Sequence, residues 1–346
     1  MIRISNCEFK RIRRSIINIR SLNLLSYPRG MLFTILTQKK VDYVKKFYPK
    51  ALDKLDEIEK FWKKEGKYPP WLKLTPVMRV RLLLKSHSLS KSAINKILND
   101  PYEVHSEVES SMHPEKLEKV IWNSIYTDYV YSPLAVVLQR ARGKLGEEIL
   151  KEWLEKNNIE FKTEKDMRGK FSKTPDFFFE ESFNVDGTQI NWIESKALFG
   201  DLRTHRLYAK KQFDVYKEMF GEGYVVYWFG CLSELKDNIL STDLFKSNLK
   251  SVLDDMIVYT TGRKEKIEHI ANAVVIDVSG DLDSSMYVEF NNNIYSREFL
   301  EGIKKVIDCY SKGRILIVDN EANWRKSIRK KIGRILHNMG FAVLHF

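Results

Sequence analysis

The chain has 346 residues, 43% of them hydrophobic and 12% aromatic, which is enough for two or three folded domains with sizeable cores. Its three cysteines are widely spaced and form no CxxC pair, which argues against a disulfide framework or a thiolate zinc site. No apolar run reaches the ~18 to 20 residues that a membrane span needs. We therefore expect an intracellular protein without a membrane association, in the nucleus or cytoplasm of a eukaryote or the cytoplasm of a prokaryote.

The net charge of +12 is concentrated at the N-terminus. Residues 1–30 hold seven basic residues against one acid, which is half of the net charge. We expect this segment to be a basic, poorly ordered arm. Three interpretations of it remain open: a nucleic-acid-binding tail, an organelle transit peptide, or sequence upstream of a true start at Met31.

Residues 31–142 are predicted to form a helical region, because apolar residues recur at helical spacing between clear breaks. Within it, LTPVMRVRLLLKSHSLSKSAINKILNDP predicts two helices. Thr75 is a suitable N-cap before Pro76, and Ser88 or Ser90 can cap the second helix. The short SHS link would allow a helix-turn-helix.

The second helix of this pair has a polar, basic face formed by Lys91, Asn95 and Lys96. Such a face would suit contact with DNA. It would equally suit the solvated side of an ordinary helical bundle, since helix pairs are common and DNA-binding ones are a minority. Both interpretations stay open, with these three residues as the candidate nucleic-acid-binding positions.

After Gly143 the pattern changes to mixed α/β. Residues 143–239 predict an amphipathic helix, strands at TPDFFFE and TQINWIESKA, a further helix and a buried strand at YVVYWFG. Residues 240–346 predict a C-terminal α/β extension with strands at NAVVIDV, MYVEF, RILIVD and FAVLHF. There RKSIRKKIGR favours an amphipathic helix with a basic outer face over a phosphate site. An ordinary turn is likewise favoured over an acidic site at Asp277, Asp281 and Asp283.

Charged residues recur in the part of the α/β segment that should be buried. Glu147 shares a helix face with the leucines three and seven residues further on, so this acid should point inward. Asp176 follows a proline at the start of a strand, and Glu194 and Lys196 share one face of the next strand. Buried charges are costly, so this pattern needs a reason.

Whether Asp176 joins Glu194 depends on the hairpin between them. A two-residue turn would place Asp176 on the opposite face from Glu194. A three-residue loop, Val185-Asp186-Gly187, or an equivalent bulge would place Asp176 opposite Lys196, on the same face as Glu194. We predict the second arrangement, because it brings the charges together.

Three carboxylates at one place repel one another, so such a site is stable with a bound cation or with raised pKa values. Oxygen ligands without cysteine or clustered histidine select a hard ion, Mg²⁺ or Mn²⁺. A lysine beside them can stabilise negative charge on a phosphate or orient the attacking water. The residues therefore predict phosphodiester hydrolysis with a metal ion, whose ligands would be Glu147, Asp176 and Glu194 with Lys196 assisting.

The order of a helix acid, Pro-Asp, a hairpin and Glu-x-Lys is that of the PD-(D/E)xK nuclease core. The stretch TPDFFFEESFNVDGTQINWIESKALFGD, followed by QFDVY and GEGYVVYWFG, resembles the codanin-interacting nuclease family, which carries a TPD motif. SKSAINKILNDP and YSPLAVVLQRARGKLGEEILKEWL resemble the helical half of the same family. The resemblance covers roughly residues 70–235.

This resemblance implies an α/β fold: a helical region with helix-turn-helix elements, then a restriction-endonuclease-like core that is similar to Holliday junction resolvases. It places Asp176, Glu194 and Lys196 at the signature positions. Glu147 then corresponds to the preceding helix acid, and Gln212 to a polar residue on the following helix. The resemblance also implies a codanin-like protein partner in a eukaryote and a homodimer, as is common among resolvase-like enzymes.

The leading hypothesis is an endonuclease that depends on Mg²⁺ or Mn²⁺ and acts on nucleic acid, structured DNA above all. One rival is a non-catalytic nucleic-acid-binding or scaffold protein that keeps the nuclease fold. Another is a helix-turn-helix regulator that binds one duplex sequence and cleaves nothing.

Overall fold

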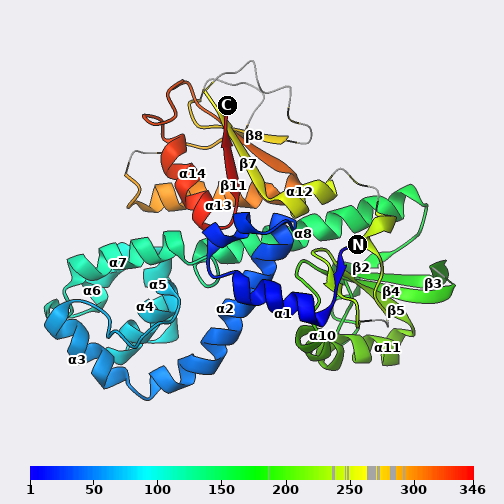
Figure 1. The fold of residues 1–346 in the computed structure, drawn as a ribbon, viewed down its shortest axis with the longest axis horizontal. Coiled ribbons are helices and arrows are strands. Elements are labelled where there is room, and N and C mark those ends of the chain that lie inside the picture. The colour runs from blue at the N-terminus through cyan, green and yellow to red at the C-terminus, as the bar shows by residue number, and fades with distance from the viewer. Residues whose placement is uncertain are drawn as a thin grey trace. The chain divides into compact units, whose positions relative to one another are not determined.

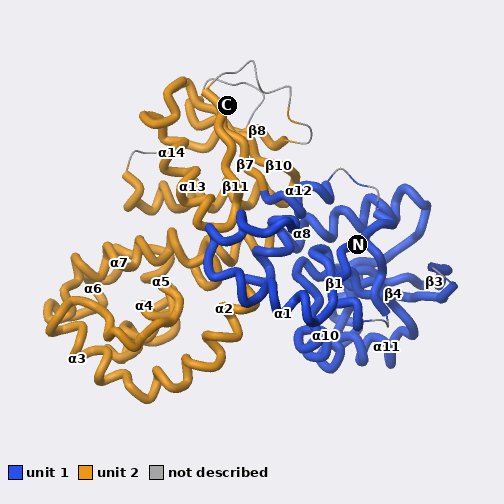
Figure 2. Tube along the Cα trace, viewed as in Figure 1, with its two compact units in different colours: residues 1–36, 142–256 blue, residues 37–141, 257–346 orange. Residues whose placement is uncertain are grey.

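The computed structural model describes residues 1–185, 187–235, 238–245, 247, 249–262, 270, 273–280, 286–290 and 293–346. The fold is mixed α/β, with a helical N-terminal part followed by sheets (Figure 1). The chain divides into two compact units, each built from two separated segments (Figure 2). Unit 1 contains residues 1–36 and 142–256, and unit 2 contains residues 37–141 and 257–346. The sequence predicted four consecutive segments. In the structure the N-terminal segment groups with the nuclease-like core, and the helical region groups with the C-terminal extension.

The basic N-terminal segment is ordered and belongs to unit 1. It forms β1 (Arg3–Ile4), α1 (Asn6–Ser15) and the 3-10 helix η1 (Ile19–Leu24), and β1 pairs in parallel with β6 (Cys231–Leu232). Phe9 and Ile12 on α1 are buried, and the Phe9 ring stacks on Phe199 with centroids 5.3 Å apart. The prediction of a poorly ordered arm is therefore wrong. The segment is ordered because apolar residues at helical spacing lie among its charged residues and pack into unit 1.

The helices of unit 2 bury two large side chains, Trp62 and Trp122. Their bounds are α3 (Leu55–Glu65), α4 (Pro76–Ser86), α5 (Lys91–Asn99), η2 (Pro101–Glu103), α6 (Val104–Glu107), η3 (Ser110–Met112) and α7 (Pro114–Thr127), and α2 (Arg29–Leu52) precedes them. The predicted helix pair is α4 and α5, and Ser90 caps α5 by accepting the backbone N–H of Ala93 at 3.1 Å. Among the described residues, no helix combines the length and apolar character needed to cross a membrane.

The helix expected after Gly143 is part of one longer helix, α8 (Pro133–Lys156). A glycine in a helix interior costs about 1 kcal/mol relative to alanine, so Gly146 needs a reason. A Cβ atom there would lie 2.3 Å from Nε1 of Trp228 and 3.1 Å from Oγ of Ser195. The missing side chain lets α8 pack directly on the sheet of unit 1.

Four strands form the sheet of unit 1 in the order β2-β3-β4-β5, with β2–β3 and β3–β4 antiparallel and β4–β5 parallel. On the face opposite α8, a long helix with a π turn runs along the sheet (Figure 1), and Trp192 of β4 lies with its ring centroid 5.4 Å from that of Tyr216 on this helix. The elements are β2 (Lys162–Thr163), α9 (Glu164–Met167), β3 (Phe177–Val185), β4 (Thr188–Lys196), α10 (Leu202–Tyr208), the π turn η4 (Ala209–Phe213), α11 (Asp214–Phe220), β5 (Gly223–Tyr227), η5 (Thr242–Leu244) and α12 (Leu249–Asp255).

Unit 2 contains a five-stranded parallel sheet in the order β11-β7-β10-β8-β9. Its elements are β7 (Ile257–Thr261), β8 (Ala273–Asp277), β9 (Met286–Tyr287), α13 (Arg297–Asp308), η7 (Cys309–Lys312), β10 (Arg314–Val318), α14 (Arg329–Asn338) and β11 (Ala342–His345). The four strands predicted for the C-terminal extension are present. β7 is a further strand that we did not predict.

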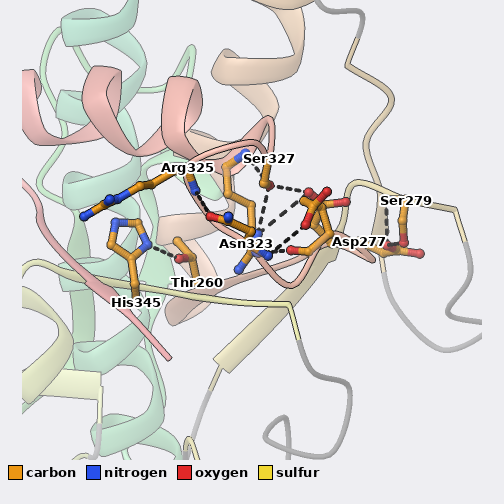
Figure 3. A network of polar contacts seen from close by, with 10 residues as sticks. Thr260, Asp277, Ser279, Asn323, Arg325, Ser327 and His345 are labelled. Atoms are coloured by element: carbon orange, nitrogen blue, oxygen red, sulfur yellow. Dashed lines mark hydrogen bonds and ion pairs between the residues drawn. The ribbon is translucent and has the colours of Figure 1, made fainter.

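The acids and bases of the C-terminal extension have structural roles in the described residues. Asp277 is buried at the end of β8, where its Oδ1 accepts the backbone N–H and the hydroxyl of Ser279 at 2.8 and 2.6 Å (Figure 3). Asp281 and Asp283 lie outside the described residues. Arg329, the first residue of α14, is buried, and its Nε donates to Oγ of Ser327 at 3.0 Å. The predicted helix is present as α14, and Asp277 lies in a turn, whereas the prediction for Asp281 and Asp283 is not tested.

Candidate active site

The hairpin of β3 and β4 contains a bulge that decides which way Asp176 points. Near the tip the strands pair Val185 with Thr188, whereas beyond an irregularity Phe178 pairs with Trp192. Between these two pairs β3 therefore has three more residues than β4. Because side chains alternate between the faces of a sheet, this shift exchanges the faces of β3 relative to β4.

When this register is extended by one residue, Asp176 lies directly opposite Glu194, on the same face. We predicted a three-residue loop, Val185-Asp186-Gly187, or an equivalent bulge. The bulge is present, and only positions 186 and 187 separate the last strand pair, although Asp186 itself lies outside the described residues. Asp176 is opposite Glu194 rather than Lys196 because the bulge adds three residues instead of one.

Asp176, Glu194 and Lys196 are joined by direct polar contacts. The backbone N–H of Asp176 donates to Oε2 of Glu194 at 3.2 Å, and that of Ser195 donates to Oδ2 of Asp176 at 2.8 Å. Nζ of Lys196 forms an ion pair with Oε1 of Glu194. Glu194 is only 2% exposed, and both its oxygens are engaged. The three charged residues thus form one cluster on the sheet, in which Glu194 is buried and Asp176 and Lys196 are partly buried.

Burial raises the pKa of both carboxyl groups in this cluster. For Glu194, burial and the charge of Asp176 raise the pKa to about 7, although Lys196 opposes this change. For Asp176, burial again raises the pKa, opposed by Lys196 and by the N–H of Ser195. One lysine therefore does not balance two buried acids. A further cation would relieve this repulsion.

Lys196 remains a cation in this environment. Burial lowers its pKa, but the carboxylates of Glu194 and Asp176 outweigh burial, and the pKa lies above its ordinary value. On another side Nζ lies over the ring of Tyr208, 4.9 Å from its centroid, which is a cation–π contact. A lysine that keeps its proton is suited to stabilising negative charge, and it is unsuited to accepting a proton from water.

Glu147 lies at the open side of the site. Its helical spacing predicted an inward-pointing side chain, but the residue is exposed. Both Glu147 and Glu148 are exposed on α8. Desolvation and the charge of Asp176 nevertheless raise the pKa of Glu147, while Lys196 lowers it. The inward face of α8 at this position borders the acidic cluster rather than the apolar core. Glu147 can therefore reach both a ligand in the site and the solvent.

Gln212 is connected to the site through Tyr216. Its Nε2 donates to the Tyr216 hydroxyl at 3.4 Å, and that hydroxyl donates to the carbonyl of Thr174 at 2.8 Å, two residues before Asp176. Oε1 of Gln212 is buried and has no hydrogen-bond partner in the described part of the chain. Gln212 belongs to the π turn, a feature that is frequent at functional sites.

A fourth acid, Glu164, borders the site and was not predicted. In the antiparallel pairing of β2 with β3, Glu164 follows the last paired residue of β2, and Asp176 precedes the first paired residue of β3. The charge of Glu164 raises the pKa of Asp176 and Glu147, and its carboxylate forms an ion pair with Arg168 at 3.1 Å. Only the pairing of β2 with β3 reveals this residue, because nothing local in the sequence marks it.

The chemistry of the site suits a hard divalent cation, since Glu147, Asp176 and Glu194 offer carboxylate oxygens and have raised pKa values. These groups do not form a ready-made cage. Across the residues that the structure describes, no three side chains of His, Cys, Asp or Glu converge as metal ligands would. Both oxygens of Glu194 already have a partner, Lys196 on one and the backbone N–H of Asp176 on the other. A cation at this site would compete with Lys196 for Glu194.

The three candidate nucleic-acid-binding residues of α5 belong to unit 2, whereas the charged cluster belongs to unit 1. Lys91, Asn95 and Lys96 are exposed, as predicted. Nζ of Lys96 is paired with Glu103 at 2.7 Å, and Oδ1 of Asn95 accepts from Arg81 at 2.9 Å. Both contacts fit an ordinary solvated helix face, and a role in nucleic-acid contact stays a prediction.

Comparisons with known proteins place the chain in a family. A family model described as a protein of unknown function with a TPD sequence motif matches residues 113–248. Proteins called "CDAN1-interacting nuclease 1" match at 35% identity in Danio rerio, 32% in Mus musculus and 32% in Homo sapiens. These matches cover 52%, 62% and 65% of this chain and 61%, 80% and 85% of the respective relatives. The chain belongs to the CDAN1-interacting nuclease 1 family.

The site lies inside the part of the chain that the TPD-motif model matches. This part contains Thr174-Pro175-Asp176 and all the candidate site residues: Glu147, Asp176, Glu194, Lys196 and Gln212. The match to the Danio rerio member of the CDAN1-interacting nuclease 1 family spans 61% of that relative's length. No solved structure matches the chain.

Proposed function

We propose that this member of the CDAN1-interacting nuclease 1 family is an endonuclease that depends on Mg²⁺ or Mn²⁺ and hydrolyses phosphodiester bonds in nucleic acid, structured DNA above all. The observation that supports this most strongly is the cluster of Asp176, Glu194 and Lys196, in which Glu194 is buried. Such a cluster destabilises a fold through desolvation and like-charge repulsion, so its presence favours a chemical role.

In this proposal, Glu147, Asp176 and Glu194 hold the cation. When bound, the cation would activate a water molecule and polarise the phosphate. Lys196, released from Glu194, would donate to a phosphate oxygen and stabilise the charge that develops there, because it keeps its proton. The buried Oε1 of Gln212 is a free acceptor among the described residues, and it would orient the attacking water or a ligand.

The test is cleavage of a labelled panel of junction, flap, single-stranded and linear DNA and RNA with Mg²⁺ or Mn²⁺. Wild type should cut at least one substrate, and Asp176→Asn and Lys196→Ala should not. Asp176→Asn is a mild change, because the asparagine oxygen can still accept the N–H of Ser195. Cleavage that continues unchanged in both variants would show that the activity does not belong to this site.

A second candidate function is a nucleic-acid-binding or scaffold protein without catalysis. Two observations favour it. The described residues contain no preformed group of three metal ligands, and Lys196 forms an ion pair with Glu194. If this candidate is correct, Mn²⁺ should neither stabilise the protein against heat nor promote cleavage. Metal-dependent cleavage that is lost in Asp176→Asn would exclude it.

The names of the relatives also suggest a protein partner. Because the relatives are named as CDAN1-interacting, we propose that this chain binds a codanin-like protein. Purified chain and the codanin-like protein of the same organism should form a complex in size-exclusion chromatography. Asp176→Asn should bind equally well if the partner contacts a surface away from the site, and failure of the wild type to bind would reject the partner.

A further inference from the structure

An exposed phenylalanine lies close to the site on a rigid aromatic support. Phe171 is 43% exposed, an unusual state for such an apolar ring. The rings of Phe171 and Phe220 pack edge to face with centroids 5.0 Å apart, and Phe220 packs on Phe178 of β3 with centroids 5.1 Å apart. These three rings, which we call the aromatic platform, hold Phe171 in place while part of its surface stays in solvent.

Basic side chains are concentrated on two segments, one of which contains Phe171. Residues 168–175 and 202–213 contain seven lysines and arginines and no acid. All seven are exposed, and we call them the basic rim: Arg168, Lys170, Lys173, Arg203, Arg206, Lys210 and Lys211. The rim places seven positive charges on two short segments, of which Arg168 is paired with Glu164 at 3.1 Å. Its charge is complementary to a polyanion.

The platform and the rim are tied to the catalytic cluster. Nζ of Lys173 donates to the carbonyl of Lys211, and the Tyr216 hydroxyl donates to the carbonyl of Thr174 at 2.8 Å. The two basic segments therefore meet next to the start of β3. Phe171 precedes Asp176 by five residues, a stretch that spans at most about 17 Å when extended. This distance corresponds to a few nucleotides of a bound strand.

We propose that the aromatic platform and the basic rim bind a single-stranded segment of nucleic acid beside the scissile phosphate, with a base stacked on Phe171. This inference rests on the proposed function, because only a nuclease has a scissile phosphate at this site. It names the substrate class as nucleic acid with unpaired bases. In a duplex the bases stack on one another, and their faces are closed to a protein side chain. An exposed ring within a basic surface is the arrangement that binds unpaired bases of any sequence.

The experiment measures binding without cleavage. Full-length Asp176→Asn protein in EDTA is titrated into labelled oligothymidylate, oligouridylate and a blunt DNA duplex of equal length. Adding Phe171→Ala should weaken binding to the single strands about tenfold, since stacking contributes roughly 1–3 kcal/mol per base, and should leave duplex binding unchanged. Phe171→Trp should restore single-strand binding, and its fluorescence should be quenched on binding.

Matched controls separate stacking from general effects. Phe346→Ala removes another exposed phenylalanine, and Lys119→Ala removes an exposed lysine outside the rim, whereas Lys170→Ala removes one within it. Only Phe171→Ala and Lys170→Ala should weaken single-strand binding, with circular dichroism unchanged. Phe171→Ala would overturn the inference if it weakened duplex and single-strand binding equally, or if it weakened neither. Oligothymidylate and oligouridylate distinguish DNA from RNA, and a preference for either supports it.

Failure of the proposed function would look different. If wild type cleaves nothing with either metal but Phe171 is needed for single-strand binding, the chain binds unpaired strands without cutting them. If wild type cleaves and Phe171→Ala binds every ligand normally, the nuclease stands and the platform does not.

Discussion

Asp176 and Glu194 are linked by a hydrogen bond from the backbone N–H of Asp176 to Oε2 of Glu194, at 3.2 Å, while Lys196 pairs with the other oxygen of Glu194. The carboxylates therefore share one location, yet the only cation paired with Glu194 within the described residues is a lysine from the same strand. The site is electrostatically incomplete in this state, because both acids have raised pKa values.

Glu147→Gln should lower cleavage at least about 100-fold, since it removes a charge that would face the reacting phosphate and its cation. Glu148→Gln is a matched control on the next residue of α8, also exposed, and it should cleave like wild type. Single-turnover cleavage assays would compare the two. Equal loss in both variants would mean that helix charge in general, rather than Glu147, is responsible.

The stability of the metal-free protein should fall as the pH rises from 5 to 8. The pKa of Glu194 is raised from 4.5 to about 7 in the folded state, so the folded protein binds this proton more tightly than the unfolded chain. The resulting stabilisation is fully present below pH 4.5 and is lost as the pH passes 7, by up to about 3 kcal/mol. The raised pKa of Asp176 acts in the same direction.

Urea unfolding at several pH values in EDTA would measure this effect. Glu194→Gln cannot titrate at this position, so its free energy of unfolding should depend less steeply on pH than that of wild type. The comparison of slopes is insensitive to any constant cost of the substitution. Identical slopes would show that Glu194 titrates normally.

Mn²⁺ should stabilise the wild type by about 2.7 kcal/mol at 100 times its dissociation constant. Lys196→Ala should bind Mn²⁺ several-fold more tightly, because the lysine no longer competes for Glu194, and yet it should not cleave. Thermal unfolding at increasing Mn²⁺ concentration, with the Glu148→Gln control, would measure both effects. Weaker metal binding in Lys196→Ala would contradict competition for Glu194.

Phe9→Ala should destabilise unit 1 by about 3 kcal/mol, since it removes a buried ring that stacks on Phe199. Arg11→Ala on the same helix should change stability by no more than about 0.5 kcal/mol, because the Arg11 side chain is 75% exposed. Chemical denaturation would compare the two variants. An unfolding midpoint unchanged by Phe9→Ala would mean that α1 contributes little to unit 1.

The local features of the site were predictable from the sequence, and the non-local ones were not. Alternation along one strand predicted that Glu194 and Lys196 share a face. The need to unite them with Asp176 predicted a three-residue loop or an equivalent bulge, of which the structure has the bulge. Helical spacing placed Glu147 on the inward face of α8 but could not distinguish a core from an open site. The order of the N-terminal arm depends on β1 pairing with β6, more than two hundred residues later in the chain.

Two other residues of the site needed the structure. Tyr208 meets Lys196 only after α10 folds back on the sheet, and Glu164 meets Asp176 only after β2 pairs with β3. Neither partner lies at a spacing that a helix or strand pattern would reveal. Sequence periodicity describes one element at a time, whereas a catalytic surface is assembled from several.

The bulge in β3 separates the acidic pair from the tip of the hairpin. The tip or the bulge can take up added residues while Phe178 stays paired with Trp192, and the two carboxylates then remain on one face. A shift of one residue in the pairing of Phe178 with Trp192 would instead turn Asp176 to the face opposite Glu194. Homologous hairpins should therefore vary in length at the tip and the bulge, and keep the pairing beside the two acids wherever both acids are present.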